Sequence, residues 1–173
     1  MNSIECIKSR ATVRSFRPDP VPDKTIEDII EAAMQAPSAG NAQDWEFVIV
    51  TKKETKDRLV EASWGQEFIA GAPVVIIVCS NTKRIGSAYG ERGTTLYSVQ
   101  DTAAATQNLM LAAWDTGLGT CWVGSFNEEK VREVLVLPTH VRPLAIIPMG
   151  FPASKPQKPA RRKIGELLHR EYY

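Results

Sequence analysis

The segment from Leu96 to Thr116 predicts a helix that is small or apolar on most of its sides. Two sets of residues show this: Leu96, Val99, Ala103, Thr106, Met110 and Ala113 at heptad-like spacing, and Ala104, Ala105, Leu109 and Ala112 on a second face. A helix of this kind has to be buried all round. The chain has 173 residues, the size of one ordinary domain, so a subunit interface is one good way to bury it. We therefore expect the helix at the centre of a dimer, with Ala104 and Ala105 in the contact.

The remaining segments alternate between strand and helix patterns without the regular rhythm of a parallel sheet. Strands are expected at 45–50, 73–79, 120–124 and 142–150, where β-branched and apolar residues gather. A first helix is expected near residues 4–7, with Asn2 or Ser3 as its N-cap, and a second from the N-cap Asp23 to about Pro37. Two more helices are expected, over 52–62 and from the cap Asn127 to Leu135. Polar residues 80–94, with three glycines, are the best candidate for a mobile loop. The pattern predicts an α+β fold in one domain, residues 1–173.

Residues 151–173 differ in character from the rest. Pro152, Pro156 and Pro159 impose an extended path, and Ile164, Leu167 and Leu168 follow as a short apolar piece. Such an arm cannot pack alone, so it either lies against its own domain or wraps a partner.

Charge and composition exclude several classes of function. The net charge is +1, which argues against nucleic acid and membrane surfaces as partners. The longest apolar run, 74–79, is too short to cross a bilayer, and the first residues lack the apolar region of a signal peptide. Cys6, Cys79 and Cys121 indicate reduced thiols in a cytoplasmic protein. His140 and His169 lie apart, so we expect no metal site.

Four features carry candidate binding chemistry. Arg10-Ala11-Thr12-Val13-Arg14 could hold a phosphate, although two solvated arginines are the commoner meaning of such a pattern. Residues 36–45, APSAGNAQDW, are either a long turn or a surface that holds a ligand. The strand end at 120–124 offers unhindered backbone to a flat ring, or is an ordinary strand end. The basic run 158–163, KPARRK, is either a solvated face or a nucleic-acid patch, or it binds a distant phosphate that the extended arm allows it to reach.

Taken in order, these features resemble the FMN-dependent nitroreductase family over nearly the whole chain. APSAGNAQDW is similar to the family's Pro-Ser-x-x-Asn-x-Gln-Pro-Trp, and the arginine motif is followed by Ser15-Phe16. The similarity extends to AP at 72–73, QN at 107–108, GLG at 117–119, GFP at 150–152, and the terminal pair Arg162 and Glu166. Two departures are Asp44, where the family usually has proline, and a short length without the insertions that shape substrate pockets. We expect Asp44 to alter the stiffness of the loop and not its direction.

The resemblance implies a fold, a cofactor and a set of site residues. The fold is a mixed, mainly antiparallel sheet flanked by helices, in an intertwined homodimer that exchanges the arm 151–173 and holds FMN at the interface. Arg10, Thr12 and Arg162 would hold the phosphate, with Ala11 between them, and Arg14 would approach the pyrimidine side of the ring. Pro37, Ser38, Ala39 and Asn41 would contact the flavin across the interface. The backbone of Trp122, Val123 and Gly124 would lie beside the ring, and Gln66 would be near it.

The resemblance also implies an activity, which is NAD(P)H-dependent two-electron reduction by a ping-pong mechanism. Nitroaromatics, quinones or flavin-like small molecules are the expected acceptors. The flavin performs hydride transfer, so no protein acid or base is required and none is expected to be catalytic. The chain contains no G-x-G-x-x-G segment, which such a site does not need. Alternatives are a flavin-binding or storage protein, a specialised branch of the same fold such as a reductive dehalogenase or a flavin-fragmenting enzyme, and a nucleic-acid binder that uses KPARRK.

Overall fold

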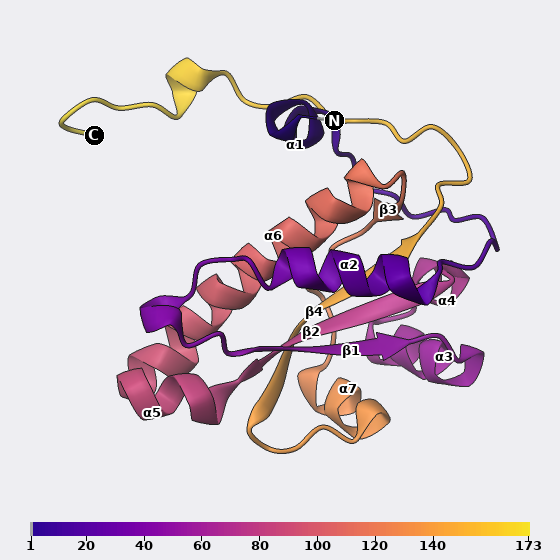
Figure 1. Ribbon diagram of the computed structural model, residues 1–173, viewed down its shortest axis with the longest axis horizontal. Coiled ribbons are helices and arrows are strands. Elements are labelled where there is room, and N and C mark those ends of the chain that lie inside the picture. Colours follow the sequence, from indigo (N-terminus) through magenta and orange to yellow (C-terminus); the bar gives the residue numbers. More distant parts are fainter. Residues whose placement is uncertain (1) are drawn as a thin grey trace.

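A four-stranded antiparallel sheet forms the centre of the protein (Figure 1). The computed structural model describes residues 2–173. The strands are β1 (Trp45–Val50), β2 (Val74–Asn81), β3 (Gly119–Thr120) and β4 (Val141–Gly150), in the order β1-β2-β4-β3. Every ladder is antiparallel, and a single bridge between Thr12 and Thr120 is parallel. The expected α+β class and mainly antiparallel sheet are confirmed.

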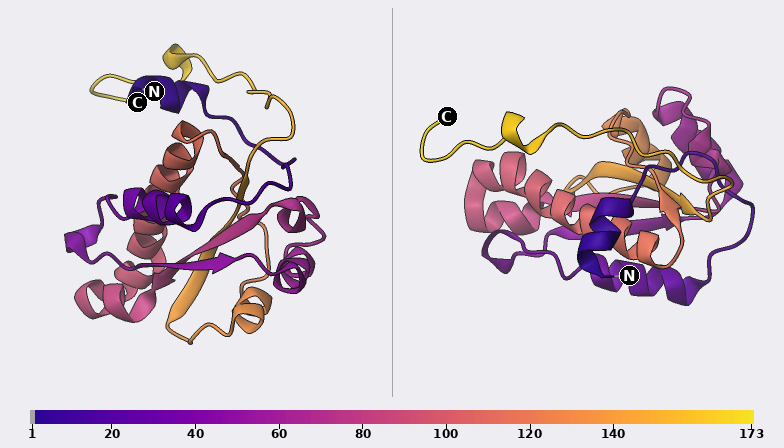
Figure 2. Two further views of the ribbon diagram at one scale, coloured as in Figure 1. Left: turned by 45° about the vertical axis from the view of Figure 1, so that its right-hand side comes forward. Right: turned by 90° about the horizontal axis from the view of Figure 1, so that it is seen from above.

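The strand β2 faces a separate apolar core on each side. Val74, Ile76 and Val78 pack in one cluster with α2 (Asp23–Ala33) and α6 (Ser98–Asp115). Val75, Ile77 and Cys79 pack in the other cluster with α3 (Lys53–Ala62), α4 (Phe68–Gly71) and α7 (Glu128–Leu135). Successive side chains of a strand point to opposite faces, so a continuous apolar strand is what a sheet covered on both sides requires. Figure 2 shows these helices on the two faces of the sheet.

The ends of the helices are set by local capping. The helix α1 (Ser3–Ser9) begins at the N-cap Asn2, where Asn2 and Glu5 form a capping box, and α7 begins after Asn127, whose side chain accepts from the Lys130 amide. Both caps were expected from the sequence. The cap predicted for α2 was wrong by one residue, because Pro22 holds the extended N-cap position and Asp23 is already helical.

The mobile loop predicted at 80–94 is wrong. The chain continues from β2 directly into α5 (Thr82–Arg92), capped by Asn81, and then through one π-helical turn, η2 (Gly93–Tyr97), into α6. Gly90 has φ 54° and ψ −138°, which produces the kink between the two helical parts. A Cβ on Gly93 would lie 2.7 Å from the Ile85 carbonyl oxygen. These glycines therefore permit a bend and close packing, and they do not mark flexibility.

The strand predicted at 120–124 is much shorter than expected. Its ladder covers only Gly119 and Thr120, and Val123 then makes one isolated bridge to Ile146. Between them the Cys121 amide donates to the Pro148 carbonyl at 3.2 Å. Proline has no amide hydrogen to return, so the ladder is interrupted at this point.

The central helix α6 is covered on one side only within a single chain. Thr102, Ala105, Thr106 and Leu109 are buried, whereas Val99 is 41% exposed and Gln100 and Gln107 are exposed. Ala105 is fully buried against Ala36 and Trp45, with Ala104 packed beside it. The expectation that Ala105 lies in a subunit contact was wrong, because this residue is fully buried within its own chain, whereas Ala104 is only partly buried and its place in a subunit contact stays a prediction. None of the helices described over 2–173 has the length and apolar character needed to cross a bilayer.

The arm 151–173 starts against its own domain and then leaves it (Figure 1). The Ala153 amide donates to the Ser15 carbonyl, and the Lys158 ammonium group contacts the Lys8 carbonyl. Beyond this point only a short turn, η3 (Ile164–Glu166), is formed. Ile164, Leu167 and Leu168 are exposed, so the apolar end of the arm is uncovered in one chain.

Candidate functional site

Apart from Arg162, the predicted site residues fall into two groups at opposite ends of α6. The Ala39 amide donates to both carboxylate oxygens of Asp101, in the first turn of the helix. At the other end, the Trp114 indole donates to Ser9 Oγ at 2.9 Å, one residue before the arginine motif. Thirteen residues of helix at 1.5 Å each separate Asp101 from Trp114 by about 20 Å. One chain therefore presents two candidate half-sites, at the two ends of α6, the helix labelled in Figure 1.

The first half-site is an extended segment, residues 10–15, lying beside β3. The Val13 amide donates to the Thr120 carbonyl at 2.9 Å, and Ala11 and Val13 are buried. Because side chains alternate along an extended segment, Arg10, Thr12 and Arg14 share the opposite side. Arg10 Nη1 is buried and has no hydrogen-bond partner among the described residues. A buried, unpaired guanidinium nitrogen is costly, and an anion would supply the acceptor that it lacks.

A cleft of about 360 Å³ adjoins these residues. It lies between Thr12–Ser15 and the start of the arm, Ser154–Gln157. The Arg14 guanidinium lies 5.7 Å from the centre of the Phe68 ring. Arg14 also faces Cys121, where burial raises the pKa of the thiol and the arginine opposes that rise. Arg14 is therefore placed between α4 and the end of β3.

Several residues in or beside this cleft were missed by the sequence prediction. Phe68, Ser154 and Lys155 line it or contact Arg14. Phe68 follows the predicted Gln66 by two residues, which was the only local signal for it. Ser154 and Lys155 are brought beside Ser15 by pairing that no sequence pattern shows.

The backbone expected beside a flat ring lies at the edge of the same half-site. Trp122 is 40% exposed and Gly124 is exposed, whereas Cys121 and Val123 are buried. The Gln66 side-chain amide donates to the Ser125 carbonyl at 2.9 Å and to the Ser63 carbonyl at 3.0 Å. Gln66 therefore anchors the backbone that follows Gly124, and its amide hydrogens are already used within the chain.

The second half-site is the tight turn that contains Pro37, Ser38, Ala39 and Asn41. Ser38 Oγ accepts from the backbone amide of Gln43 at 3.0 Å, and Asn41 Oδ1 accepts from the side-chain Nε2 of Gln43 at 3.0 Å. Gly40 and Asn41 have φ of 54° and 57°, and a Cβ on Gly40 would overlap the Tyr89 hydroxyl. Small and amide residues are thus needed because the backbone is left-handed and closely packed.

Arg162 is not brought to either half-site by contacts within the chain. Its side chain is 75% exposed, and its ion pair is with Glu166, with Nη1 and Oε2 4.0 Å apart. Any role beside Arg10 and Thr12 depends on where the arm lies in an assembly.

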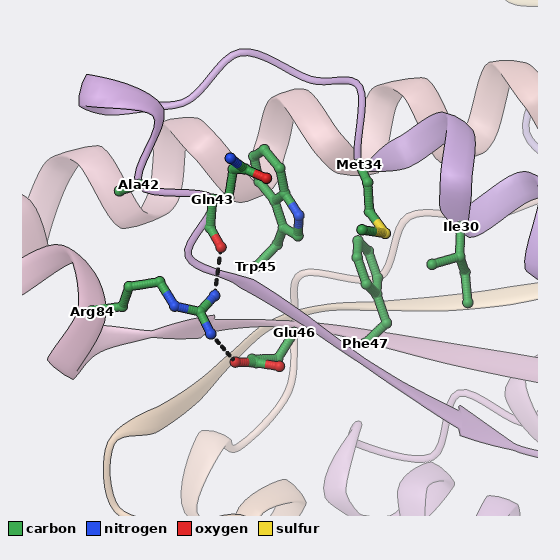
Figure 3. A pocket seen from close by; sticks show the side chains of 8 residues that line it. All are labelled: Ile30, Met34, Ala42, Gln43, Trp45, Glu46, Phe47 and Arg84. Atoms are coloured by element: carbon green, nitrogen blue, oxygen red, sulfur yellow. Dashed lines mark hydrogen bonds and ion pairs between the residues drawn. The ribbon is translucent and has the colours of Figure 1, made fainter.

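A groove of about 570 Å³ lies elsewhere, along the edge strand β1 (Figure 3). Its apolar end is formed by Ile30 of α2, the C-cap Met34 and Phe47 of β1. At the polar end, Arg84 forms an ion pair with Glu46 at 3.0 Å and donates to the Gln43 carbonyl at 2.5 Å. Ala42, Gln43 and Trp45 of the candidate segment 36–45 line this groove, but none of the residues that the family resemblance assigns to the flavin does.

A Gly119→Ala substitution is expected to displace the arginine segment. The new Cβ would overlap the Val13 side chain, so the segment 10–15 must move away from β3. We expect a loss of about 1–3 kcal/mol in the free energy of unfolding, as for other overpacked sites, together with weaker anion binding. Denaturant unfolding measures the first effect. Gly124→Ala is the matched control, because its Cβ would meet only the Trp122 indole, at an ordinary 3.8 Å. Equal losses in the free energy of unfolding in both variants would contradict the overlap with Val13 as the cause.

Comparison with known proteins identifies the family. A model described as "Nitroreductase family" matches residues 7–66 and 61–151. A protein of Methanothermobacter thermautotrophicus, whose name combines NADH dehydrogenase with NAD(P)H nitroreductase, is 35% identical over 162 residues, covering 90% of this chain and 80% of its own. The Bacillus subtilis FMN reductase [NAD(P)H] is 30% identical over 183 residues, covering 98% and 74%.

The fold agrees with these relatives. The structure of the NADPH:FMN oxidoreductase from Vibrio harveyi complexed with NAD+ superposes with a TM-score of 0.91 at 26% identity, covering 100% of this chain and 78% of that one. The family model covers most of the chain and the fold is that of its members, so the chain belongs to the nitroreductase family.

Proposed function

We propose that this chain is a homodimeric flavoenzyme that reduces small nitroaromatic, quinone or flavin-like acceptors by a ping-pong mechanism. Its class is that of its relatives, the NAD(P)H-dependent oxidoreductases with FMN as cofactor. The observation that carries the site assignment is the buried, unpaired Arg10 Nη1 beside Thr12. A dianionic phosphate supplies the acceptor oxygens that this nitrogen lacks. The residues present therefore fit FMN.

Each segment of the site has a role that follows from its geometry. Arg10 and Thr12 bind the phosphate, and Arg14 lies toward the ring, where a cation favours the negative charge that a flavin gains on reduction. Gln66 fixes the backbone after Gly124 through Ser125, so that this backbone can lie beside the ring. Bound FMN supplies the hydride chemistry, and the chain binds, orients and excludes water.

The dimer follows from the separation of the half-sites. If two α6 helices cross antiparallel on their exposed faces, the turn 37–41 of one copy approaches Arg10–Arg14 of the other. The Val99 side of α6 is the face left open in the single chain. Two equivalent sites are then formed about a two-fold axis, as expected for a closed homodimer.

The exchanged arm has a matching surface. Its exposed Ile164, Leu167 and Leu168 need an apolar surface, and the groove of Ile30, Met34 and Phe47 beside the unpaired edge of β1 provides one (Figure 3). We propose that the arm of the partner lies there, which would also cover the open strand edge. In the same assembly Arg162 would reach the phosphate. The buried free cysteines fit a reducing, cytoplasmic location.

The visible absorption spectrum of the purified protein tests the function directly. We expect a flavin band, either as purified or after incubation with FMN, that bleaches when NADH or NADPH is added without oxygen. Re-oxidation by a quinone or nitroaromatic after removal of the nicotinamide would support two separate half-reactions. Absence of any flavin band after incubation with FMN would contradict the proposal, and a band that neither nicotinamide bleaches would indicate another donor or a storage role.

A further inference from the structure

Two buried carboxyl groups meet beneath the turn 37–41. Asp44 is fully buried just before β1, and Asp101 is almost fully buried in the first turn of α6. Asp101 accepts the Ala39 amide with Oδ1 at 3.1 Å and Oδ2 at 3.0 Å. The turn is therefore held to α6 by a carboxyl group that Asp44 touches from the other side.

The hydrogen bonds around Asp44 leave one oxygen without a donor. Its Oδ2 accepts from the Ser80 hydroxyl of β2, and its carbonyl accepts from the Asn81 amide at 2.6 Å. No described donor faces Oδ1, and the Asp101 carboxyl lies within hydrogen-bonding reach of the Asp44 carboxyl. Two acceptors in contact are satisfied only if a proton lies between them.

The charged groups nearby do not neutralise the pair. Glu46 of β1 and Arg84 of α5 are paired with each other, and the Tyr89 side chain of α5 lies beside Gly40. The groups that act on the Asp44 carboxyl are Ser80 of β2, Asp101 of α6 and the backbone of Asp44 itself. Burial above all, and then the hydrogen bond and repulsion from Asp101, raise the pKa of Asp44 to about 6, against the opposing hydrogen bond from Ser80.

We propose that Asp44 and Asp101 share one proton, and that this shared proton holds the turn 37–41 against α6. The inference rests on the proposed function in one respect, because that turn is the half-site that the partner's flavin would contact. Asp44 and Asp101 are positioning residues, since they act through the turn and touch no reacting atom. Loss of the proton leaves two adjacent carboxylates, whose repulsion loosens the contact with Ala39.

The direction of the pH dependence follows from the raised pKa. Asp44 binds its proton more tightly in the folded chain than in the unfolded one, so this group stabilises the fold most at low pH. The stabilisation is lost as the pH rises from about 4 through about 6. The turn should accordingly be held firmly at pH 5 and loosely at pH 8.

The substitution Asp44→Asn separates this proposal from a merely structural role. The asparagine oxygen can still accept from Ser80, and its amide hydrogen takes the place of the shared proton toward Asp101. Hydrogen–deuterium exchange of the 36–45 segment, corrected for the pH dependence of chemical exchange, measures the turn in the flavin-free full chain. We expect wild-type protection to fall about tenfold between pH 5 and pH 8, and Asp44→Asn to keep its pH 5 protection throughout.

Controls make each outcome decisive. Glu46→Gln removes a nearby carboxyl outside the pair and should show the wild-type pH profile of exchange protection. Asp101→Asn is a second variant, in which an amide hydrogen faces Asp44. A wild-type profile without pH dependence, or an Asp44→Asn profile equal to wild type, would overturn the shared proton. FMN titration at each pH should show the same contrast, which is an affinity that falls as the pH rises in wild type and stays constant in Asp44→Asn. If no FMN binds at any pH, the proposed function fails while the exchange experiment still decides the inference.

Discussion

Replacing Arg10 with alanine is expected to weaken FMN binding by about 10- to 100-fold. A hydrogen bond to a charged group contributes about 1.5–3 kcal/mol, and each 1.4 kcal/mol changes a dissociation constant about tenfold. In wild type the buried Arg10 Nη1 has no partner among the described residues, so the phosphate would be its acceptor. Fluorescence titration with FMN and with riboflavin measures the effect. Wild type should prefer FMN, and Arg10→Ala should lose most of that preference because riboflavin carries no phosphate.

Arg17→Ala is the matched control for this prediction. Arg17 follows the segment 10–15 by two residues, but it pairs with Asp19 at 3.0 Å and its guanidinium lies 5.0 Å from the centre of the Phe151 ring. Its removal should leave the FMN preference unchanged. Arg10→Lys should recover part of the affinity for FMN, because lysine supplies the positive charge but not the forked set of donors of arginine. An Arg10→Ala protein that still prefers FMN as strongly as wild type would place the phosphate elsewhere.

The local structure was predictable wherever the side chain itself decides the conformation. Asn2 and Asn127 cap their helices because their side chains accept backbone amides, and the apolar run of β2 is buried on both faces. Prediction failed where the conformation of a residue depends on a contact with a residue elsewhere in the fold. Gly93 is needed because the Ile85 carbonyl lies close, and β3 is cut short by Pro148 on another strand. Neither contact can be read from the sequence pattern alone.

The candidate site was predictable as a set of motifs but not as an arrangement. The order of the motifs picked out Arg10, Thr12 and the turn 37–41, whose roles remain predictions. Their division between the two ends of α6 is a property of the folded chain. Asp44 was expected to affect only the stiffness of its loop, and its contact with Asp101 could not be inferred, because the two residues are far apart in sequence.

An Ala103→Glu substitution is expected to dissociate the dimer and abolish high-affinity FMN binding. Ala103 is only partly buried in one chain and lies on the same open side of α6 as Val99 and Gln107. Two glutamates brought near a two-fold axis would be desolvated without partners, which costs several kcal/mol. We expect the dimer dissociation constant to rise at least 100-fold, by the same conversion of about 1.4 kcal/mol to each tenfold change. Light scattering after size exclusion, followed by FMN titration, measures both consequences.

The choice of Ala103 over its neighbours makes the result interpretable. A glutamate at Ala105 would break packing against Ala36 and Trp45 inside the single chain, so loss of the dimer there would follow from unfolding. Ala103→Glu should instead keep a wild-type circular dichroism spectrum. Lys130→Glu, a larger charge change on exposed α7 across the sheet, should leave the dimer intact. Because each copy holds its half-sites about 20 Å apart along α6, a folded Ala103→Glu monomer that binds FMN as tightly as wild type would show that one chain completes the site alone.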